Sequence, residues 1–521
     1  MADLYKGRTM ANAIDGTQSQ SRSAEEVNID IVKQMANLVA SSLGPRGRDK
    51  MLVDNVGSAT FTNDGATILR ETKFEHPTTK IIVGLAKTQE SEAYDGTTSA
   101  ILLVGELCRQ AEILMKEGVH VAQIEDGYEI GKNAALEHLQ TLALPEVTDS
   151  QLEGIAGTAM TGKHAGVAKE HLTKLCLTAA KKTKPSNVNI IARPGSSITS
   201  TYDIPEGIII DQQKMNHGMA KEITNAKIAI IDCDLILPRF TEGVNVNFQT
   251  GADADAYSQK RKADVLEIGA HLKGMGINFV LCGKDIDPVL SEFFARNNMM
   301  AVRRCNASIL EMVAEVTDAL IVSSLGDLTE EDLGDAERIN EHTQEGWTKA
   351  VLHFNGLPNN TRHSIVCTAP SQEAADEISR ALDDAIGVTY LAFTNKKIVT
   401  GGGSPQVSMA LHVQQVANTV EGLEQLAVEA FAKSLEIIPL TLAKNCGHNP
   451  RLSVINLRAA HGQGSVNAYL NVANGGVITG RPYAVIEPMS VIEVGINSST
   501  TAAIQILRID NIIQARDPNE M

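Results

Sequence analysis

Aromatic side chains are scarce in this 521-residue sequence, which has a single Trp and only 4% Phe, Trp and Tyr together. Proteins that bind single-stranded nucleic acids stack bases on such rings. The formal net charge is −17, from 46 basic and 63 acidic residues, and an acidic surface repels phosphate backbones. Both features argue against nucleic acid as a partner. The length and a hydrophobic content of 43% predict a globular protein of several domains.

Cysteine pairs and long apolar runs are also missing. The seven cysteines are odd in number, widely scattered and form no C-x-x-C motif, which predicts reduced, mostly buried thiols in a cytoplasmic protein. No apolar run reaches about 18 residues, and the start, MADLYKGRTM, lacks the apolar core of a signal peptide. We therefore expect neither secretion nor a membrane span. With no H-E-x-x-H motif and no Cys/His cluster, a metal held by protein ligands alone is not expected.

Hydrophobic periodicity divides the chain into helical and mixed parts. Helical patterns occupy the first part, at 23–43, 66–73, 78–92, 98–117 and 121–143. Residues 226–325 alternate apolar strands such as AKIAIIDCD with amphipathic helices such as DPVLSEFFARNN. Helical patterns return after residue 371 and end in a helix near 499–515. This order predicts an α/β domain inserted into a discontinuous helical one.

One segment, 242–273, interrupts the alternation with a polar stretch and a helix. It carries apolar residues, among them Phe248, Tyr257 and Val265. Exposed apolar residues in an insertion predict a binding surface or a lid, although core packing is the default for any single one.

Residues 157–164, GTAMTGKH, contain most of the P-loop pattern G-x-x-x-x-G-K-[ST]. His164 stands where a hydroxyl should reach Mg²⁺, and the preceding residues have helical rather than strand spacing. A P-loop must follow a buried strand and open a helix. The sequence therefore favours a lysine, Lys163, that follows a helix, over a P-loop.

Four other segments carry residues suited to nucleotide phosphates. They are the loop 43–47, the turn around Asp64, the segment 95–99 and the glycines 401–403. The first three have a structural alternative: a helix C-cap, an Asn-Asp-Gly turn, and Asp95 as a helix N-cap. The three glycines allow a close backbone approach that any Cβ would block. A further pair, Asp383-Asp384, is predicted on a solvated helix face. Together they offer amides for phosphate and carboxylates for Mg²⁺ and water, the set that nucleotide hydrolysis needs.

Several motifs then occur in an order that resembles one family, the group II chaperonins, which include the archaeal thermosome and the eukaryotic chaperonin TRiC. They include LGPRGRDKMLVD, NDGATILRE, HPTTKIIVGLAKTQE, DGTTSA, TAMTGK, GGGSPQV and VIEP. The resemblance covers essentially the whole chain and is closer to the archaeal branch. Four places depart from the family pattern. Tyr94 replaces a glycine, Gln406 and Asn449 stand where acidic residues are usual, and the segment 474–487 lacks the acidic-methionine stretch that usually precedes VIEP.

The resemblance implies a multidomain α and α/β fold, the chaperonin fold. A helical equatorial ATPase domain would comprise 1–143 and 399–521, and a small α/β intermediate domain 144–211 and 363–398. The α/β apical domain would be 212–362, with a helical protrusion at about 242–273 as a built-in lid.

The resemblance also implies ATP and Mg²⁺ as cofactors. The residues cradling the phosphates would be Leu43, Gly44, Pro45, Gly47, Gly96, Thr97, Thr98 and Ser99. Asp95 would ligate Mg²⁺, while Asp64 and Asp384 would place the attacking water. Lys163 would approach the γ-phosphate as the intermediate domain closes. Gly402 and Glu487 would contact the nucleoside.

The expected function is an ATP-dependent protein-folding subunit of a double ring. Its partners would be unfolded polypeptides and other chaperonin subunits of one or several types, with eight subunits expected per ring. An alternative is a holding or scaffold ring with weak hydrolysis, suggested by the departures at Tyr94, Gln406 and 474–487. A third, a metabolic phosphotransferase, would need an acceptor pocket with its own acid or base, which the sequence does not offer.

Overall fold

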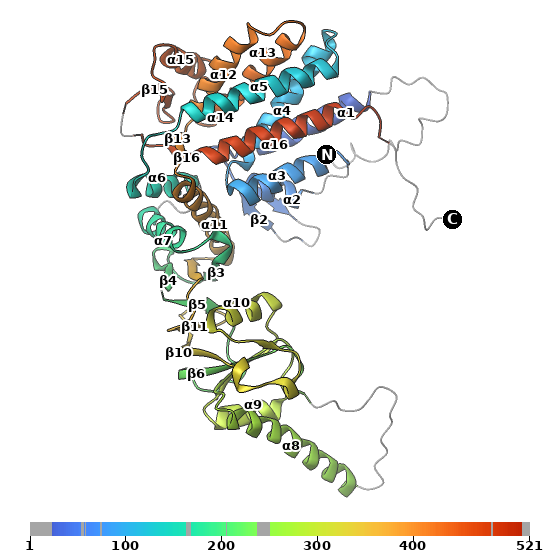
Figure 1. Cartoon of the computed structure of the whole chain (residues 1–521), viewed down its shortest axis with the longest axis vertical. Coiled ribbons are helices and arrows are strands. Elements are labelled where there is room, and N and C mark those ends of the chain that lie inside the picture. Colours follow the sequence, from blue (N-terminus) through green and yellow to red (C-terminus); the bar gives the residue numbers. More distant parts are fainter. Residues whose placement is uncertain are drawn as a thin grey trace, which may run out of the picture. The chain divides into compact units, whose positions relative to one another are not determined.

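The computed structural model describes residues 23–53, 57, 59–72, 76–162, 168–204, 206–236, 251–480 and 483–512 (Figure 1). The chain forms two compact units. Unit 1 comprises Met1–Ala143, Thr400–Pro482 and Met489–Met521, and unit 2 comprises Leu144–Val399 and Tyr483–Pro488. Lys163 and the predicted lid residues 242–250, Phe248 included, lie outside the described residues.

Unit 1 is mostly helical and combines both ends of the chain. Its helices are α1 (Ala24–Ala40), α2 (Gly65–Glu71), α3 (Thr79–Ala93), α4 (Thr97–Lys116), α5 (Val121–Thr141), α12 (Ser404–Ala417), α13 (Glu424–Leu435), α14 (Ile437–Asn445), α15 (Pro450–Gly462) and α16 (Met489–Leu507). Two antiparallel hairpins accompany them, β1 (Lys50–Val53) with β2 (Ala59–Thr62), and β14 (Tyr469–Leu470) with β15 (Val477–Ile478).

Helix α4 lies in the core of unit 1, packed against α1, α3, α13 and α16 (Figure 1). It is buried around most of its circumference, because its middle reads AILLVGELC. A Cβ added at Gly105 would lie 2.4 Å from Cβ of Ala36, so α1 and α4 approach closely. Helix α5 packs on α13 through the edge-to-face rings of Tyr128 and Phe431, and Tyr128 Oη donates to the Leu107 carbonyl at 2.7 Å. Segments from both ends of the chain thus share one core.

The final helix is where the sequence expectation was wrong. The pattern placed it near 499–515, whereas α16 spans Met489–Leu507. Its middle contains Gly495, Ser498 and Ser499, which have weak helix propensity. Burial overrides that propensity, since Ser499 is fully buried and its hydroxyl donates to the Ala100 carbonyl at 2.9 Å.

Unit 2 contains a large mixed sheet with strand order β5-β11-β10-β6-β7-β8, and β9 paired to β6. The strands are β5 (Gly207–Ile210), β6 (Glu222–Ile231), β7 (Phe279–Cys282), β8 (Met300–Val302), β9 (Ile321–Val322), β10 (Gly334–His342) and β11 (Val351–Asn355). Alternate residues of β6 face opposite sides. Ile228 and Ile230 pack with α10 (Ala307–Thr317), and Ala229 and Ile231 with α9 (Pro288–Arg296).

A smaller sheet, in the order β3-β12-β4, completes unit 2 with helices around it. Its strands are β3 (Val188–Pro194), β4 (Tyr202–Ile204) and β12 (His363–Ala369), and its helices are α6 (Asp149–Ala159), α7 (Lys169–Lys182) and α11 (Gln372–Asn395). Every residue of β12 is buried, as expected for a central strand. Two short strands, β13 (Ile398–Thr400) and β16 (Ile486–Pro488), pair with each other.

Helix α8 (Gly251–Gly274) is the described part of the predicted lid segment. The residues that open it are exposed, and Tyr257 is 37% exposed. Val265 and Leu272, in its second half, are buried in the core that the large sheet forms with α9. Val265 is therefore a core residue, while Tyr257 is a surface residue.

All seven cysteines are unpaired, and six of them are buried, as the sequence predicted. Burial raises the pKa of the Cys108 thiol to about 12. In the part of the chain that the structure describes, no helix is long and apolar enough to cross a membrane.

Candidate functional site

The start of helix α4 has the geometry of an anion site. Helix α3 ends at Ala93, and its C-cap Tyr94 is in the left-handed region with φ 60° and ψ −9°; Asp95 joins it to Gly96, the N-cap of α4. Because the N-cap is a glycine, it has no side chain with which to cap α4. Asp95 is therefore not the N-cap that the alternative interpretation required; its Oδ1 accepts from the Gly96 N–H at 2.6 Å. The first backbone amides of α4, at Thr97, Thr98 and Ser99, lie at the positive end of the helix dipole, which favours binding of phosphate.

Asp64 lies at the start of helix α2 and is its N-cap. Its Oδ2 accepts from the backbone N–H of Thr67 at 2.7 Å. A Cβ added at Gly65 would lie 2.8 Å from Thr98 Oγ1 and 3.2 Å from the Thr98 nitrogen. The start of α2 therefore packs directly on the first turn of α4, which places the Asp64 segment beside the Asp95–Ser99 segment.

Two glycine loops from opposite ends of the chain pack on one helix, α14. A Cβ at Gly44 would lie 2.4 Å from Leu442 Cδ2, and one at Gly403 would lie 2.7 Å from Pro439 Cβ. Asn445, the last residue of α14, donates its amide to the carbonyls of Ala40 and Leu43, both at 2.9 Å. The loops 43–47 and 401–403 therefore share one support.

Further contacts fix the conformation of these loops. Arg46 Nη1 donates to the Cys446 carbonyl at 3.0 Å. A Cβ at Gly47 would lie 2.1 Å from the Ser42 carbonyl oxygen, so only glycine fits there. The Gly402 carbonyl accepts from the Leu470 N–H at 3.2 Å.

The other predicted site residues belong to unit 2 or to the undescribed part. Asp384 lies on α11, half-buried, next to the exposed Asp383 and off the buried face of Ile378 and Leu382, as the sequence predicted. Glu487 lies in β16 and is half-buried. Lys163 falls in the undescribed stretch 163–167.

GTAMTGKH does not form a P-loop. Gly157 lies inside helix α6, which ends at Ala159, rather than after a strand. Its carbonyl accepts from Thr161 Oγ1 at 2.6 Å, which closes the helix end. The spacing of Gly157 to Lys163 is therefore coincidental, as the helical pattern before it indicated.

A cation at this site would need ligands from more than the protein. Within the described ranges, no group of three or more His, Cys, Asp or Glu is placed to hold a metal ion. Asp95, beside the start of α4, offers one carboxylate. Mg²⁺ commonly takes one or two carboxylates and completes its shell with phosphate oxygens and water. The residues at the start of α4 fit a magnesium nucleotide.

Sequence reasoning missed the residues that hold these segments in place. Gln89 is fully buried and donates to the Asp95 carbonyl at 2.7 Å. Pro439, Leu442 and Asn445 support the two glycine loops. A signal existed for Gln89, because it is a polar residue in the otherwise mostly apolar stripe of α3 that includes Ile82 and Ala86. The contacts of α14 with the loop 43–47 link residues about 400 positions apart and leave no local pattern.

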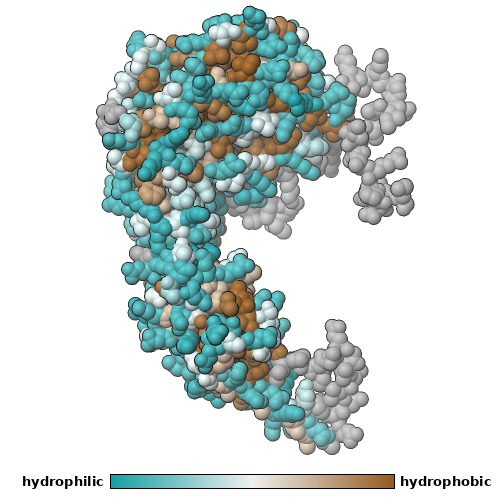
Figure 2. Space-filling model, in the orientation of Figure 1, coloured by the Kyte–Doolittle hydropathy of each residue, from teal (hydrophilic) through white to brown (hydrophobic). Residues whose placement is uncertain are grey.

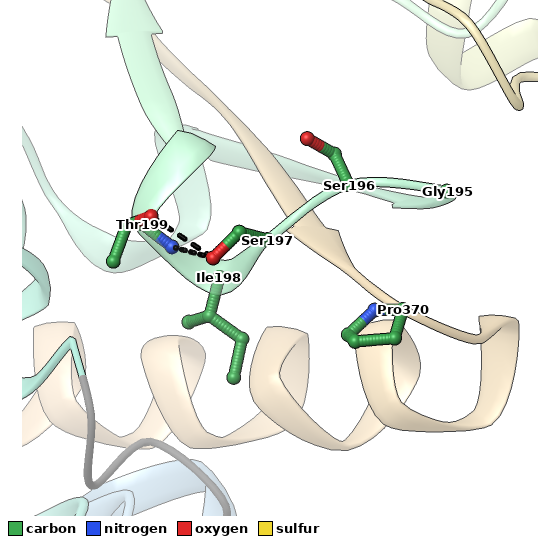
Figure 3. Close-up of a pocket in the computed structure, with 6 residues that line it drawn as sticks. All are labelled: Gly195, Ser196, Ser197, Ile198, Thr199 and Pro370. Carbon is green, nitrogen blue, oxygen red and sulfur yellow. Dashed lines mark hydrogen bonds between the residues drawn. The ribbon is translucent and has the colours of Figure 1, made fainter.

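A pocket in unit 2 contains none of the predicted site residues. Figure 3 shows that it is lined by residues 195–199 and Pro370. The hydroxyls of Ser197 and Thr199 bond to each other at 2.9 Å, and the Thr199 N–H donates to Ser197 Oγ at 3.3 Å (Figure 3). These polar groups stabilise their own turn, and nothing else here indicates a ligand.

The chain belongs to the TCP-1/cpn60 chaperonin family, which its sequence matches over residues 35–517. It is similar to thermosome subunit alpha of Archaeoglobus fulgidus, at 37% identity over 96% of this chain and 94% of the relative. Thermosome subunit alpha of Thermoplasma acidophilum is 36% identical over 96% and 94%. The thermosome subunit of Methanocaldococcus jannaschii is 36% identical over 95% and 93%. The chain is thus a chaperonin of the archaeal type, and the resemblance drawn from its motifs is confirmed.

Proposed function

We propose that this chain is an ATP-dependent protein-folding subunit of a double ring, and that its nucleotide binds in unit 1. The observation that carries the proposal is the start of α4, where a helix with a glycine N-cap follows Asp95 and lies against the Asp64 segment. Family membership supports the same function. It does not favour the alternative, a holding ring with weak hydrolysis.

The residues take the roles that the family resemblance implies. The loop 43–47 and the α4 residues Thr97, Thr98 and Ser99, preceded by Gly96, hold the phosphates, and Gly402 and Glu487 contact the nucleoside. Asp95 ligates Mg²⁺. Asp64 and Asp384 orient the attacking water, and Lys163 meets the γ-phosphate. Bound Mg²⁺ would neutralise phosphate charge, which together with positioning supplies most of the catalysis in phosphoryl transfer.

We further assign unit 1 as the equatorial domain and unit 2 as the intermediate and apical domains. The breaks after Ala143 and Val399 support this division. The small sheet with α6, α7 and α11 is the intermediate part. The large sheet with α8 is the apical part, and α8 belongs to its helical protrusion.

Unfolded polypeptide would bind to unit 2. Figure 2 shows apolar side chains gathered over the part of unit 2 that holds α10 and the large sheet in Figure 1. Just after α10 in the sequence, Leu320 is 60% and Ile321 of β9 is 38% exposed, and Tyr257 of α8 is exposed as well. Exposed apolar patches mark protein-binding sites. The other partners are further chaperonin subunits, of one or several types, eight to a ring, in the cytoplasm.

The test is ATP hydrolysis and ATP-driven refolding of a denatured protein, for the wild type, Asp384→Ala and Asp383→Ala. The two aspartates are neighbours on α11, so Asp383→Ala controls for the loss of one charge. Loss of a residue that positions the water should reduce turnover by about 10²–10⁴-fold in Asp384→Ala only. Omission of Mg²⁺ should abolish turnover in all three. A wild type that assembles but does not turn over ATP above the level of Asp384→Ala would contradict the proposal and favour the holding ring.

A further inference from the structure

Gln89 occupies a position where its polarity is costly. It lies in the middle of the buried stripe of α3, between Ala86 and Ala93, and is fully buried. Its Oε1 has no hydrogen-bond partner among the residues that the structure describes. A buried acceptor left unpaired is destabilising, and an apolar side chain of the same size would avoid that cost. The amide is therefore not explained by the stability of α3 alone.

The two N–H groups of Gln89 are both used, and both reach backbone carbonyls outside α3. Nε2 donates to the Asp95 carbonyl at 2.7 Å and to the Val491 carbonyl, in the first turn of α16, at 3.1 Å. One side chain thus connects α3, the turn before α4 and the start of α16.

The Asp95 carbonyl and the Gly96 N–H belong to the same peptide group, and both ends of that group are held. The carbonyl accepts from Gln89, and the N–H donates to the Asp95 carboxylate at 2.6 Å. The residues on either side of Asp95, Tyr94 and Gly96, are both left-handed, with φ of 60° and 83°. This turn could relax by rotating the peptide, and the Gln89 hydrogen bond opposes that rotation.

Gln89 also shapes the space around Gly96. A Cβ added at Gly96 would lie 2.8 Å from Val491 Cγ1 and 3.0 Å from Gln89 Nε2. The N-cap of α4 is therefore pressed between the Gln89 amide and α16.

We propose that Gln89 is a positioning residue for nucleotide binding: it orients the Asp95–Gly96 peptide, and through it the Asp95 carboxylate and the first amides of α4. The inference rests on the proposed function, since it assigns Gln89 to the site where Mg²⁺ and phosphate are proposed to bind. Gln89 itself touches neither of them.

The experiment measures binding of ADP by calorimetry, with and without Mg²⁺, together with thermal unfolding, on the full chain. The variants are Gln89→Met, which keeps the volume and removes both donors, and Gln89→Glu, which keeps the shape and, as a buried neutral carboxyl, keeps one donor for the two carbonyls. Leu85→Met, on the same buried stripe one turn earlier, is the matched control.

Gln89→Met is expected to keep the unfolding temperature of the control and to bind ADP about tenfold more weakly with Mg²⁺, a factor equivalent to about 1.4 kcal/mol. Without Mg²⁺ the loss should be smaller, because the Asp95 carboxylate then contributes less. Gln89→Glu should lose less affinity for ADP than Gln89→Met, because it keeps one of the two donors. Leu85→Met should bind as the wild type does.

Three results would overturn the inference. One is Gln89→Met binding ADP as tightly as the wild type in both conditions, which would leave the proposed function intact. Another is a loss of binding that accompanies an equal loss of unfolding temperature and is the same with and without Mg²⁺, which would make Gln89 a packing residue. A wild type that binds no nucleotide would instead remove the proposed function, and this inference with it.

Discussion

Tyr94 adopts a backbone conformation that suits glycine, and this allows a quantitative test of the turn before α4. Its φ of 60° and ψ of −9° place it in the left-handed region, at the C-cap of α3. An L-residue with a Cβ pays about 1–2 kcal/mol there. Glycine avoids that cost, but it lowers the stability of the fold by about 0.5–1 kcal/mol because the unfolded chain has more conformational freedom. Glycine should therefore be better than alanine at this position by roughly 0.5–1 kcal/mol.

The comparison is Tyr94→Gly against Tyr94→Ala, because both lose the ring and its contacts, and only the Cβ differs. The assay is native-state hydrogen exchange over the end of α3 and the start of α4, which reports local opening. Lys87, exposed in the middle of α3, is the control position. There glycine should be worse than alanine by about 1 kcal/mol. Stronger protection in Tyr94→Ala than in Tyr94→Gly would refute the reasoning.

Three further changes have outcomes fixed by packing and charge. Gly131→Ala should lower the unfolding temperature, since its Cβ would lie 2.8 Å from the Phe431 ring and overpacking costs about 1–3 kcal/mol. Gly154→Ala should raise it, since a Cβ there meets nothing within 4 Å and helix propensity improves by about 0.5–1 kcal/mol. Burial, with His342 nearby, lowers the pKa of His353 to about 4 from its usual 6.5. As the pH falls, the unfolded chain therefore takes up this proton before the folded protein does. The stability that depends on a neutral His353 is present above pH 6.5 and is lost as the pH falls toward 4. His353→Gln should weaken that pH dependence in thermal unfolding, and unchanged dependence would contradict the assignment.

The sequence predicted an element well where the local pattern of apolar and turn residues determines its structure. Helix α4, expected at 98–117, spans Thr97–Lys116, because its apolar residues and the preceding Asp-Gly leave little choice of start. It did not predict elements whose structure is determined by contacts between residues far apart in the chain. The antiparallel pair β10 and β11 was not predicted, since the polar β10 residues gain their order from pairing with β6 and β11. Asp64 and Asp95 could be selected from sequence, but the contact of Gly65 with Thr98 that relates their segments could not.

The same reasoning applies to the two glycine loops, which share a support only in the folded chain. The loop at Gly44 and the loop at Gly403 are separated in sequence by all of Leu144–Val399, yet both pack on α14 within one turn, at Leu442 and Pro439. Closing a long loop costs little more than closing a moderate one, because the entropy grows only with the logarithm of length. A large insertion is therefore compatible with a site built from both chain ends. The two loops gain their shared support only after the terminal segments have packed into one helical unit. A ligand held by both loops would bind the folded unit and not the separated segments, and would stabilise that packing by mass action.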